Sequence, residues 1–443
     1  MKIPLSDHFS YRKLLRFTMP SIMMMIFISI YGVVDGLFVS NYAGKASLTA
    51  INLVMPYIMM FGSFGFMLGT GGTALISKTL GMGDSEKANE IFSMLAVVCV
   101  IAGVLLTAVA MLLLRPVVTL LGAEGEILEN SMHYGMIVLP ATTAYILQFS
   151  FQSFCVTAEK SNLSLTMTVV SGLCNIALDF LFVAILGWGL RGAAAATAIS
   201  QFIGAVIPLV YFSRKNPSLL RLRKFRFDGK ALLRAFTNGS SELMSNLSMN
   251  IVAMLYNLQL MRYAGEDGVA AYGVIMYVNL VFMATFIGFS IGTAPLFGYN
   301  HGANNESELK NLFRKSITVL AAAAVVMATS AILLSGTLAR LFVGYDEHLM
   351  TMTVQGFMIY ACSFLFSGFN MFGSAMFTAF NNGLISAVIS FVRTLICQIA
   401  AVLLLPLIFG LEGIWMSIVV AEFTAVLLTT CCFVKFRKRY HYA

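Results

Sequence analysis

The sequence predicts an all-α integral membrane protein, with twelve transmembrane helices in two parallel six-helix repeats around a central cleft. Its composition, its long apolar segments and an internal repeat together support this fold class. Hydrophobic residues make up 59% of the chain and charged residues only 11%, and the mean hydropathy is +0.85. Because soluble domains usually contain about 25% charged residues, these values exclude a soluble globular protein.

Long apolar segments account for most of the chain. Each is long enough for the roughly 20 residues that a helix needs to cross a bilayer. We expect helices at residues 14–40, 49–77, 89–114, 131–155, 163–186, 192–213, 232–261, 269–299, 312–336, 353–378, 385–408 and 413–434. The first segment is too long for the apolar region of a signal peptide, and no small-residue cleavage pattern follows it, so we expect it to remain as a helix.

Lysine and arginine residues gather in alternate loops. If the N-terminus is cytoplasmic, 21 basic residues lie on the cytoplasmic side and five on the outer side. This asymmetry follows the positive-inside rule. It predicts a multi-pass protein of a bacterial-type cytoplasmic membrane with both termini inside, and it explains the net charge of +8 without a nucleic-acid partner.

The two halves of the sequence repeat with a constant offset of 221 residues. The shift places Tyr42-Ala43-Gly44 on Tyr263-Ala264-Gly265, Gly71 on Gly292, Gly81 on Gly302, Thr157-Ala158 on Thr378-Ala379 and Gly192 on Gly413. Because each half contains six helices, both halves start on the same side and the repeats are parallel. We expect an N-lobe at residues 1–213, a basic cytoplasmic linker at 214–231, and a C-lobe with a short basic tail at 232–443. A chance alignment of glycine-rich membrane segments is the alternative.

Five ionisable residues lie inside the expected helices: Asp35, Asp179, Glu242, Arg393 and Glu422. A charge at membrane depth is costly unless it is paired, protonated or hydrated, so each of these residues carries a functional hypothesis.

Polar residues of the N-lobe fall at one depth. Asn175 and Asp179 are four residues apart and therefore share one face of a helix. At about 1.5 Å per residue, Asp35, Asp179 and Thr197 each lie roughly 7–11 Å below the outer surface. Equal depth within one lobe permits a single site.

The chemistry of this site favours cation binding. Two carboxylates close together in a low-dielectric cavity either share a proton or bind a cation. Asn175 and Thr197 add neutral oxygens, which Na⁺ accepts as ligands and to which a protonated carboxyl can hydrogen-bond. The coupling ion is therefore H⁺ or Na⁺, and the residues do not separate the two. The alternative is that Asp35 and Asp179 only fix helix packing. We expect no organic cofactor and no other metal, because the histidines lack metal-ligand spacing.

Three further features concern conformation and the C-lobe. Pro20 lies fifteen residues before Asp35 and removes one helical hydrogen bond, so it is a candidate hinge or a fixed kink. Arg393 and Glu422 lie on neighbouring helices, where we expect an intramembrane ion pair of structural importance. With Glu242 they are the candidate polar residues of the C-lobe.

Several motifs carry a resemblance to a known family. They are Pro20, Asp35-Gly36-Leu37-Phe38-Val39, Pro56, Leu80-Gly81-Met82-Gly83-Asp84 followed by Lys87-Ala88, and Pro295-Leu296-Phe297-Gly298-Tyr299-Asn300-His301-Gly302-Ala303. With these motifs the chain resembles the multidrug and toxic compound extrusion (MATE) family over nearly its whole length.

The resemblance is to the branch that includes archaeal and DNA-damage-inducible bacterial members. It implies an N-lobe cation site made by Asp35, Asn175, Asp179 and Thr197. Another branch uses a Glu on helix 7 and an Asp on helix 10. Here helix 10 has no acid, only Asn370, so Glu242 lacks that partner.

The predicted function is secondary active multidrug export, in which H⁺ or Na⁺ exchanges for amphipathic, cationic organic compounds by alternating access of the two lobes. A flippase for lipid-linked saccharides is the alternative within transport, although such proteins often have more helices and a more basic cavity. A channel is disfavoured because no filter-like segment is present, and an enzyme because there is no nucleotide-binding loop or soluble domain. We expect small organic substrates, the lipid bilayer as surroundings, and a monomer.

Overall fold

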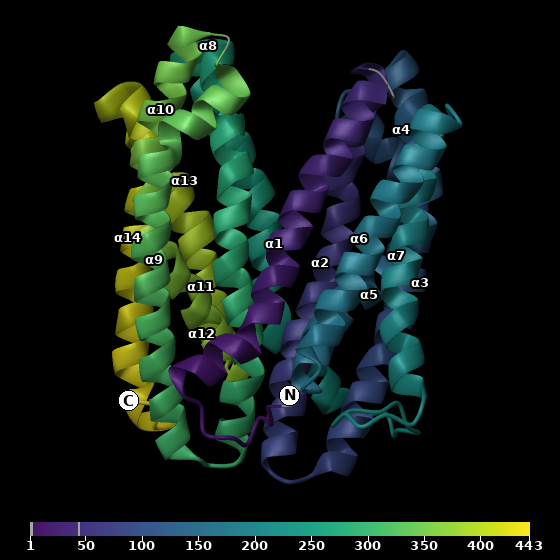
Figure 1. Ribbon diagram of the computed structural model, residues 1–443, viewed down its shortest axis with the longest axis vertical. Coiled ribbons are helices and arrows are strands. Elements are labelled where there is room, and N and C mark those ends of the chain that lie inside the picture. The colour runs from purple at the N-terminus through teal and green to yellow at the C-terminus, as the bar shows by residue number, and fades with distance from the viewer. Residues whose placement is uncertain (1–2, 43–44, 345) are drawn as a thin grey trace.

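The structure is a computed structural model that describes residues 3–42, 45–344 and 346–443. Within these ranges the side chains of residues 33, 35–42, 45, 46, 48, 52, 250 and 341 are not described. Every element in the described ranges is a helix, and the helices form two bundles side by side (Figure 1).

The first bundle contains the N-terminal elements. They are α1 (Tyr11–Tyr42), α2 (Lys45–Gly81), α3 (Ser85–Leu120), α4 (Gly125–Val138), η1 (Leu139–Ala141), α5 (Thr142–Thr157), α6 (Ser161–Asp179), the π-helical η2 (Phe180–Ile185) and α7 (Gly189–Ser213).

The second bundle contains the C-terminal elements. They are α8 (Gly229–Gly302), α9 (Glu306–Val343), α10 (Glu347–Ala361), α11 (Phe364–Ala379), α12 (Gly383–Phe391), the π-helical η3 (Val392–Cys397), α13 (Gln398–Leu404) and α14 (Pro406–Tyr440).

The helices account for the twelve predicted membrane crossings. Ten described helices are long and apolar enough to cross a membrane, and the pair α10 and α11, bent by 47°, forms an eleventh crossing. The long helix α8 folds back at Gly265, where φ is 63° and ψ is −150°. Tyr256 and Tyr272 stack across this fold with ring centroids 5.1 Å apart, whereas a straight helix would separate them by about 24 Å. α8 therefore crosses twice.

Some predicted boundaries were wrong. The loop expected between the spans 232–261 and 269–299 is absent, because the positive φ that glycine adopts easily at Gly265 reverses the chain within a single turn. The span 353–378 is broken between Ala361 and Phe364. The helix α14 begins at Pro406 but is interrupted at Gly410, where φ is 57° and ψ is −134°, so its continuous part starts close to the predicted start of the last crossing at residue 413.

The two bundles meet at the end of the molecule that holds both termini, here called the terminal end, and they diverge toward the far end (Figure 1). A Cβ atom on Gly81 of α2 would collide with the carbonyl oxygen of Tyr299 in α8, and one on Gly302 with the carbonyl oxygen of Lys78. The 221-residue repeat relates these two contacts to each other. Glycine contacts of this kind let helix backbones approach closely in membranes, and here they form a pseudo-symmetric seam between the bundles.

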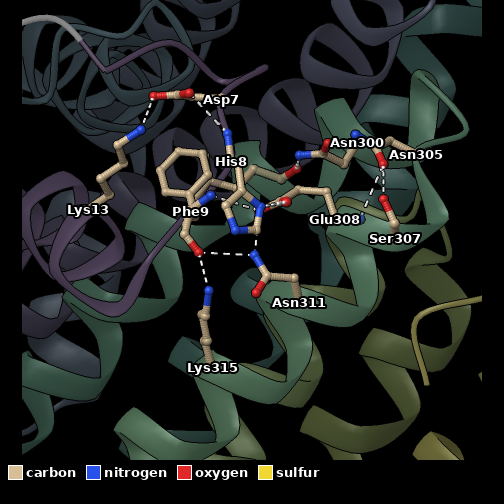
Figure 2. Close-up of polar contacts among 11 residues, drawn as sticks. Asp7, His8, Phe9, Lys13, Asn300, Asn305, Ser307, Glu308, Asn311 and Lys315 are labelled. Carbon is tan, nitrogen blue, oxygen red and sulfur yellow. Dashed lines mark hydrogen bonds and ion pairs between the residues drawn. The ribbon is translucent and has the colours of Figure 1, made fainter.

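The segment before α1 also joins the two bundles at the terminal end. The N–H of Leu5 donates to Glu159 Oε1 at 2.8 Å, in the turn between α5 and α6. The N–H of Phe9 donates to Glu308 Oε1 at 3.0 Å, and His8 Nδ1 lies 2.6 Å from Glu308 Oε2, in the first turn of α9 (Figure 2). Leu5 and Phe9 are fully buried. The N-terminal segment therefore clamps the first bundle to the second.

The linker between α7 and α8 is fixed against α3. The N–H of Arg221 donates to Asn89 Oδ1 at 2.6 Å, and the N–H of Arg223 donates to Ser93 Oγ at 2.8 Å. The linker ends three residues before the predicted boundary at residue 231. The reason is that Asp228 caps α8 by accepting hydrogen bonds from the N–H groups of Lys230 and Ala231, each at 3.0 Å.

Candidate functional site

One face of α6 is polar over its whole length and faces the interior of the first bundle. Its residues are Ser164, Thr168, Ser171, Asn175 and Asp179, which follow one another at intervals of three or four and are each at most 5% exposed. Residues at this spacing lie on one side of a helix. The sequence analysis identified only Asn175 and Asp179. The remaining three could have been found from the same spacing.

A hydrogen bond joins this face of α6 to α7. Ser171 Oγ donates to the carbonyl oxygen of Ser200 at 2.6 Å, and Ser200 Oγ donates to that of Thr197 at 2.8 Å. The two helices are successive crossings and run antiparallel. Asn175 lies about 6 Å beyond Ser171, and Thr197 about 4.5 Å from Ser200 in the same direction. The structure therefore places Asn175 and Thr197 at similar heights on adjacent helices, and Thr197 is 5% exposed.

The third helix beside this face is α1. A Cβ atom on Gly172 of α6 would meet the ring of Phe27 in α1, so the two helices are in direct contact there. α1 and α6 run in the same direction, which brings the backbone of Asp35 toward the level of Asp179. The side chain of Asp35, a predicted site residue, lies outside the described residues.

Asp179 is the last residue of α6 before the chain changes from α-helical to π-helical hydrogen bonding in η2. π-helical turns often occur at functional sites because they displace side chains from the regular helical positions. The Asp179 side chain is fully buried.

The amide of Asn175 is also fully buried, and neither its oxygen nor its nitrogen hydrogen-bonds to any described residue. An unsatisfied buried polar group costs about 1–3 kcal/mol. A bound ion or a proton on a neighbouring carboxyl would supply a partner, so the residues present suit a small cation. Gln148 of α5, which the sequence analysis missed, lies beside the polar face of α6, with its Nε2 3.5 Å from Ser171 Oγ. It also packs against Gly204 of α7.

Pro20 lies within α1, which continues as a helix on both sides of it. It borders a shallow apolar groove of about 330 Å³ between α1 and α6, together with Met19, Met23 and Leu165. The role of Pro20 as a hinge stays a prediction.

The C-lobe residues form a separate network. Arg393 of η3 and Glu422 of α14 form the predicted ion pair, with Arg393 Nη2 at 2.7 Å and Nε at 2.8 Å from Glu422 Oε1. Asn370 Nδ2 donates to Glu422 Oε2 at 2.8 Å, and Thr429 donates to Asn370 Oδ1. Within the described part of the chain, Glu242 forms no ion pair with Arg393.

Comparison with known proteins identifies the family. A family model described as MatE matches residues 20–181 and 243–404, one match in each predicted lobe. The chain is 25% identical over 428 residues to the multidrug export protein MepA of Staphylococcus haemolyticus, covering 96% of this chain and 92% of that protein. It is 24% identical to MepA of Staphylococcus saprophyticus, covering 93% and 91%.

The fold is also that of solved structures. An outward-facing multidrug resistance MATE family transporter of the MOP superfamily superposes with a TM-score of 0.92 at 23% identity, covering 98% of this chain and 97% of that one. The two family matches agree with the internal repeat that the sequence predicted. The chain therefore belongs to the MatE family, and it is a membrane transporter and not an enzyme.

Proposed function

We propose that this protein is a secondary active exporter of amphipathic organic compounds, expected to be cationic, driven by the entry of H⁺ or Na⁺. The observation that carries the proposal is the buried polar face of α6, where the Asp179 carboxyl and the Asn175 amide lie at membrane depth. The names of the Staphylococcus relatives support drug-like compounds as substrates.

The coupling site consists of Asp179 and Asn175 on α6, Thr197 on α7 and Asp35 on α1. A carboxylate buried in a low-dielectric environment is stabilised either by protonation or by a bound cation. Because the Asn175 side chain makes no hydrogen bond to a described residue, its oxygen can serve as a ligand or accept a hydrogen bond from a protonated carboxyl. Both H⁺ and Na⁺ suit this set of oxygens.

The arrangement of the bundles supports alternating access. They contact each other along the glycine seam at the terminal end and diverge at the far end (Figure 1). With the terminal end in the cytoplasm, as the distribution of basic residues favours, this is an outward-facing state. Cation binding changes the equilibrium between states only if the two states differ in cation affinity. The mechanism therefore requires that the cation and the drug favour different states.

The same distribution of charge supports a bacterial cytoplasmic membrane as the location, with both termini inside, and the bacterial relatives agree with it. We propose that a single chain is sufficient, because both halves of the repeat lie within it.

Transport in everted membrane vesicles tests the function. Uptake of a fluorescent cationic drug is measured under an imposed proton gradient alone and under an imposed sodium gradient alone. We expect one of the two gradients to drive uptake by the wild type, Asp179→Asn to abolish it, and the control Glu126→Gln, at an exposed position of α4, to retain it. Uptake that ignores both gradients would rule out cation antiport.

A further inference from the structure

The linker between α7 and α8 presents basic and apolar side chains on one exposed surface. We define the linker surface as Arg223, Lys224, Arg226 and Phe227, all of which are exposed. Phe227 is 70% exposed, and it lies directly beside the three basic residues in the sequence. In the described part of the chain, no carboxylate forms an ion pair with the three basic side chains.

We propose that the linker surface binds the headgroups of anionic phospholipids in the cytoplasmic leaflet, with Phe227 inserted at the boundary between headgroups and acyl chains. Basic residues directly beside a membrane-spanning helix attract anionic lipids. Aromatic side chains favour the interfacial region of a bilayer. The inference concerns a lipid contact and does not depend on drug transport.

The backbone of the linker is held in place, so the surface is preformed. Arg221 and Arg223 are anchored by their N–H groups to Asn89 and Ser93 of α3. Leu220 is fully buried, and the N–H of Leu222 donates to the carbonyl oxygen of Phe212 at the end of α7. These bonds use main-chain groups, which leaves the basic side chains of the linker surface facing outward.

The position of the linker matches the edge of a membrane. It connects two membrane-spanning helices and lies near their ends, and it does not extend past the turn between α2 and α3 (Figure 1). α8 begins directly after it, and Leu233, the fifth residue of α8, is 65% exposed. Basic side chains at the ends of two membrane-spanning helices lie at the level of the negative lipid headgroups, and an apolar side chain beside them can reach the acyl chains.

The end of α14 offers a matched control. Arg437, Lys438 and Arg439 are also three exposed basic residues at the terminal end, but they belong to a helix and have no exposed phenylalanine among them. Removing three charges at either place lowers the general attraction to anionic lipids, so a specific site at the linker predicts that the linker substitution has the larger effect.

Native mass spectrometry of the full chain in detergent tests the proposal, with phosphatidylglycerol and phosphatidylcholine as probes. We expect the wild type to retain phosphatidylglycerol in preference to phosphatidylcholine. The triple variant Arg223→Gln/Lys224→Gln/Arg226→Gln should lose affinity for phosphatidylglycerol by roughly fivefold per charge removed, since each basic residue near an anionic surface contributes about 1 kcal/mol. Phe227→Ser should weaken binding of both lipids while the preference remains. Arg223→Lys/Arg226→Lys should keep the preference, because the charges remain.

Two results would overturn the proposal. One is equal retention of the two lipids by the wild type. The other is a loss of phosphatidylglycerol in Arg437→Gln/Lys438→Gln/Arg439→Gln as large as in the linker variant. An unchanged elution volume and melting temperature would show that each variant is folded.

Discussion

Replacing Gly302 by alanine should open the seam between the bundles at the terminal end. In the present state the added Cβ atom would collide with the carbonyl oxygen of Lys78, a main-chain atom that cannot move without moving α2. Overpacking of this kind costs about 1–3 kcal/mol. If the seam separates when the terminal end opens, as the proposed alternating access requires, that cost falls on the present state alone. It changes the equilibrium between states by about 5- to 150-fold, at roughly 1.4 kcal/mol for each factor of ten.

Distances between spin labels measure this change. Glu86 and Ser307 are exposed at the terminal end and are related by the 221-residue repeat, and so are Glu126 and Glu347 at the far end. Labels are attached to cysteines at each pair in a chain whose seven native cysteines have been replaced. We expect Gly302→Ala to lengthen the distance between 86 and 307 and to shorten that between 126 and 347.

Two comparisons make the result interpretable. Gly81→Ala is the pseudo-symmetric change, because its Cβ atom would meet the carbonyl oxygen of Tyr299, and it should give the same shift. Gly336→Ala in α9 is the control, because nothing lies within 4 Å of the added atom. If the folded Gly302→Ala and Gly81→Ala proteins kept the wild-type distances at both ends, the seam could not be the contact that closes the terminal end.

The remaining predictions concern single side chains. Asp35→Asn should abolish gradient-driven drug uptake at normal expression, and full drug resistance in cells that express this variant would exclude Asp35 from the site. Glu308→Ala should weaken the N-terminal clamp by about 1–3 kcal/mol and speed limited proteolysis before α1. A cleavage rate equal to that of the wild type would show that the clamp adds no stability. Glu422→Gln should lower stability by about 3–5 kcal/mol, since it leaves Arg393 buried without its partner. Arg393→Met/Glu422→Leu should recover most of the melting temperature in detergent, and a double variant no more stable than Glu422→Gln would contradict the structural role.

The sequence was sufficient to predict the class of fold and its crossings. Apolar length and the distribution of basic residues act through the bilayer itself, so they can be read without knowing any tertiary contact. The tight turn at Gly265 and the break before Phe364 were not predicted. Both depend on local backbone geometry within continuous apolar segments, where hydropathy gives no signal.

The candidate site was predictable only in part. Spacing alone placed Asn175 and Asp179 on one face, and the structure adds that this face meets α7 through the Ser171–Ser200 hydrogen bond. That contact joins residues far apart in the sequence, and no local pattern indicates it. The sequence predicted the pair of Arg393 and Glu422 because opposite charges inside neighbouring membrane helices are expected to pair. It did not predict that the neutral Asn370 side chain also binds Glu422. Nor does the repeat that aligns Gly81 with Gly302 show that the two helices touch.

Drug affinity as a function of pH and sodium concentration tests the central claim most directly. If cation binding at the α6 face opposes drug binding, linkage requires each to weaken the other by the same factor. A difference of one pKa unit between the two states then corresponds to about a tenfold change in drug affinity. We predict that drug affinity of the purified wild type falls as H⁺ or Na⁺ rises, and that Asp179→Asn binds drug with an affinity independent of both. A wild-type affinity that stays constant across both titrations would contradict coupling through this site.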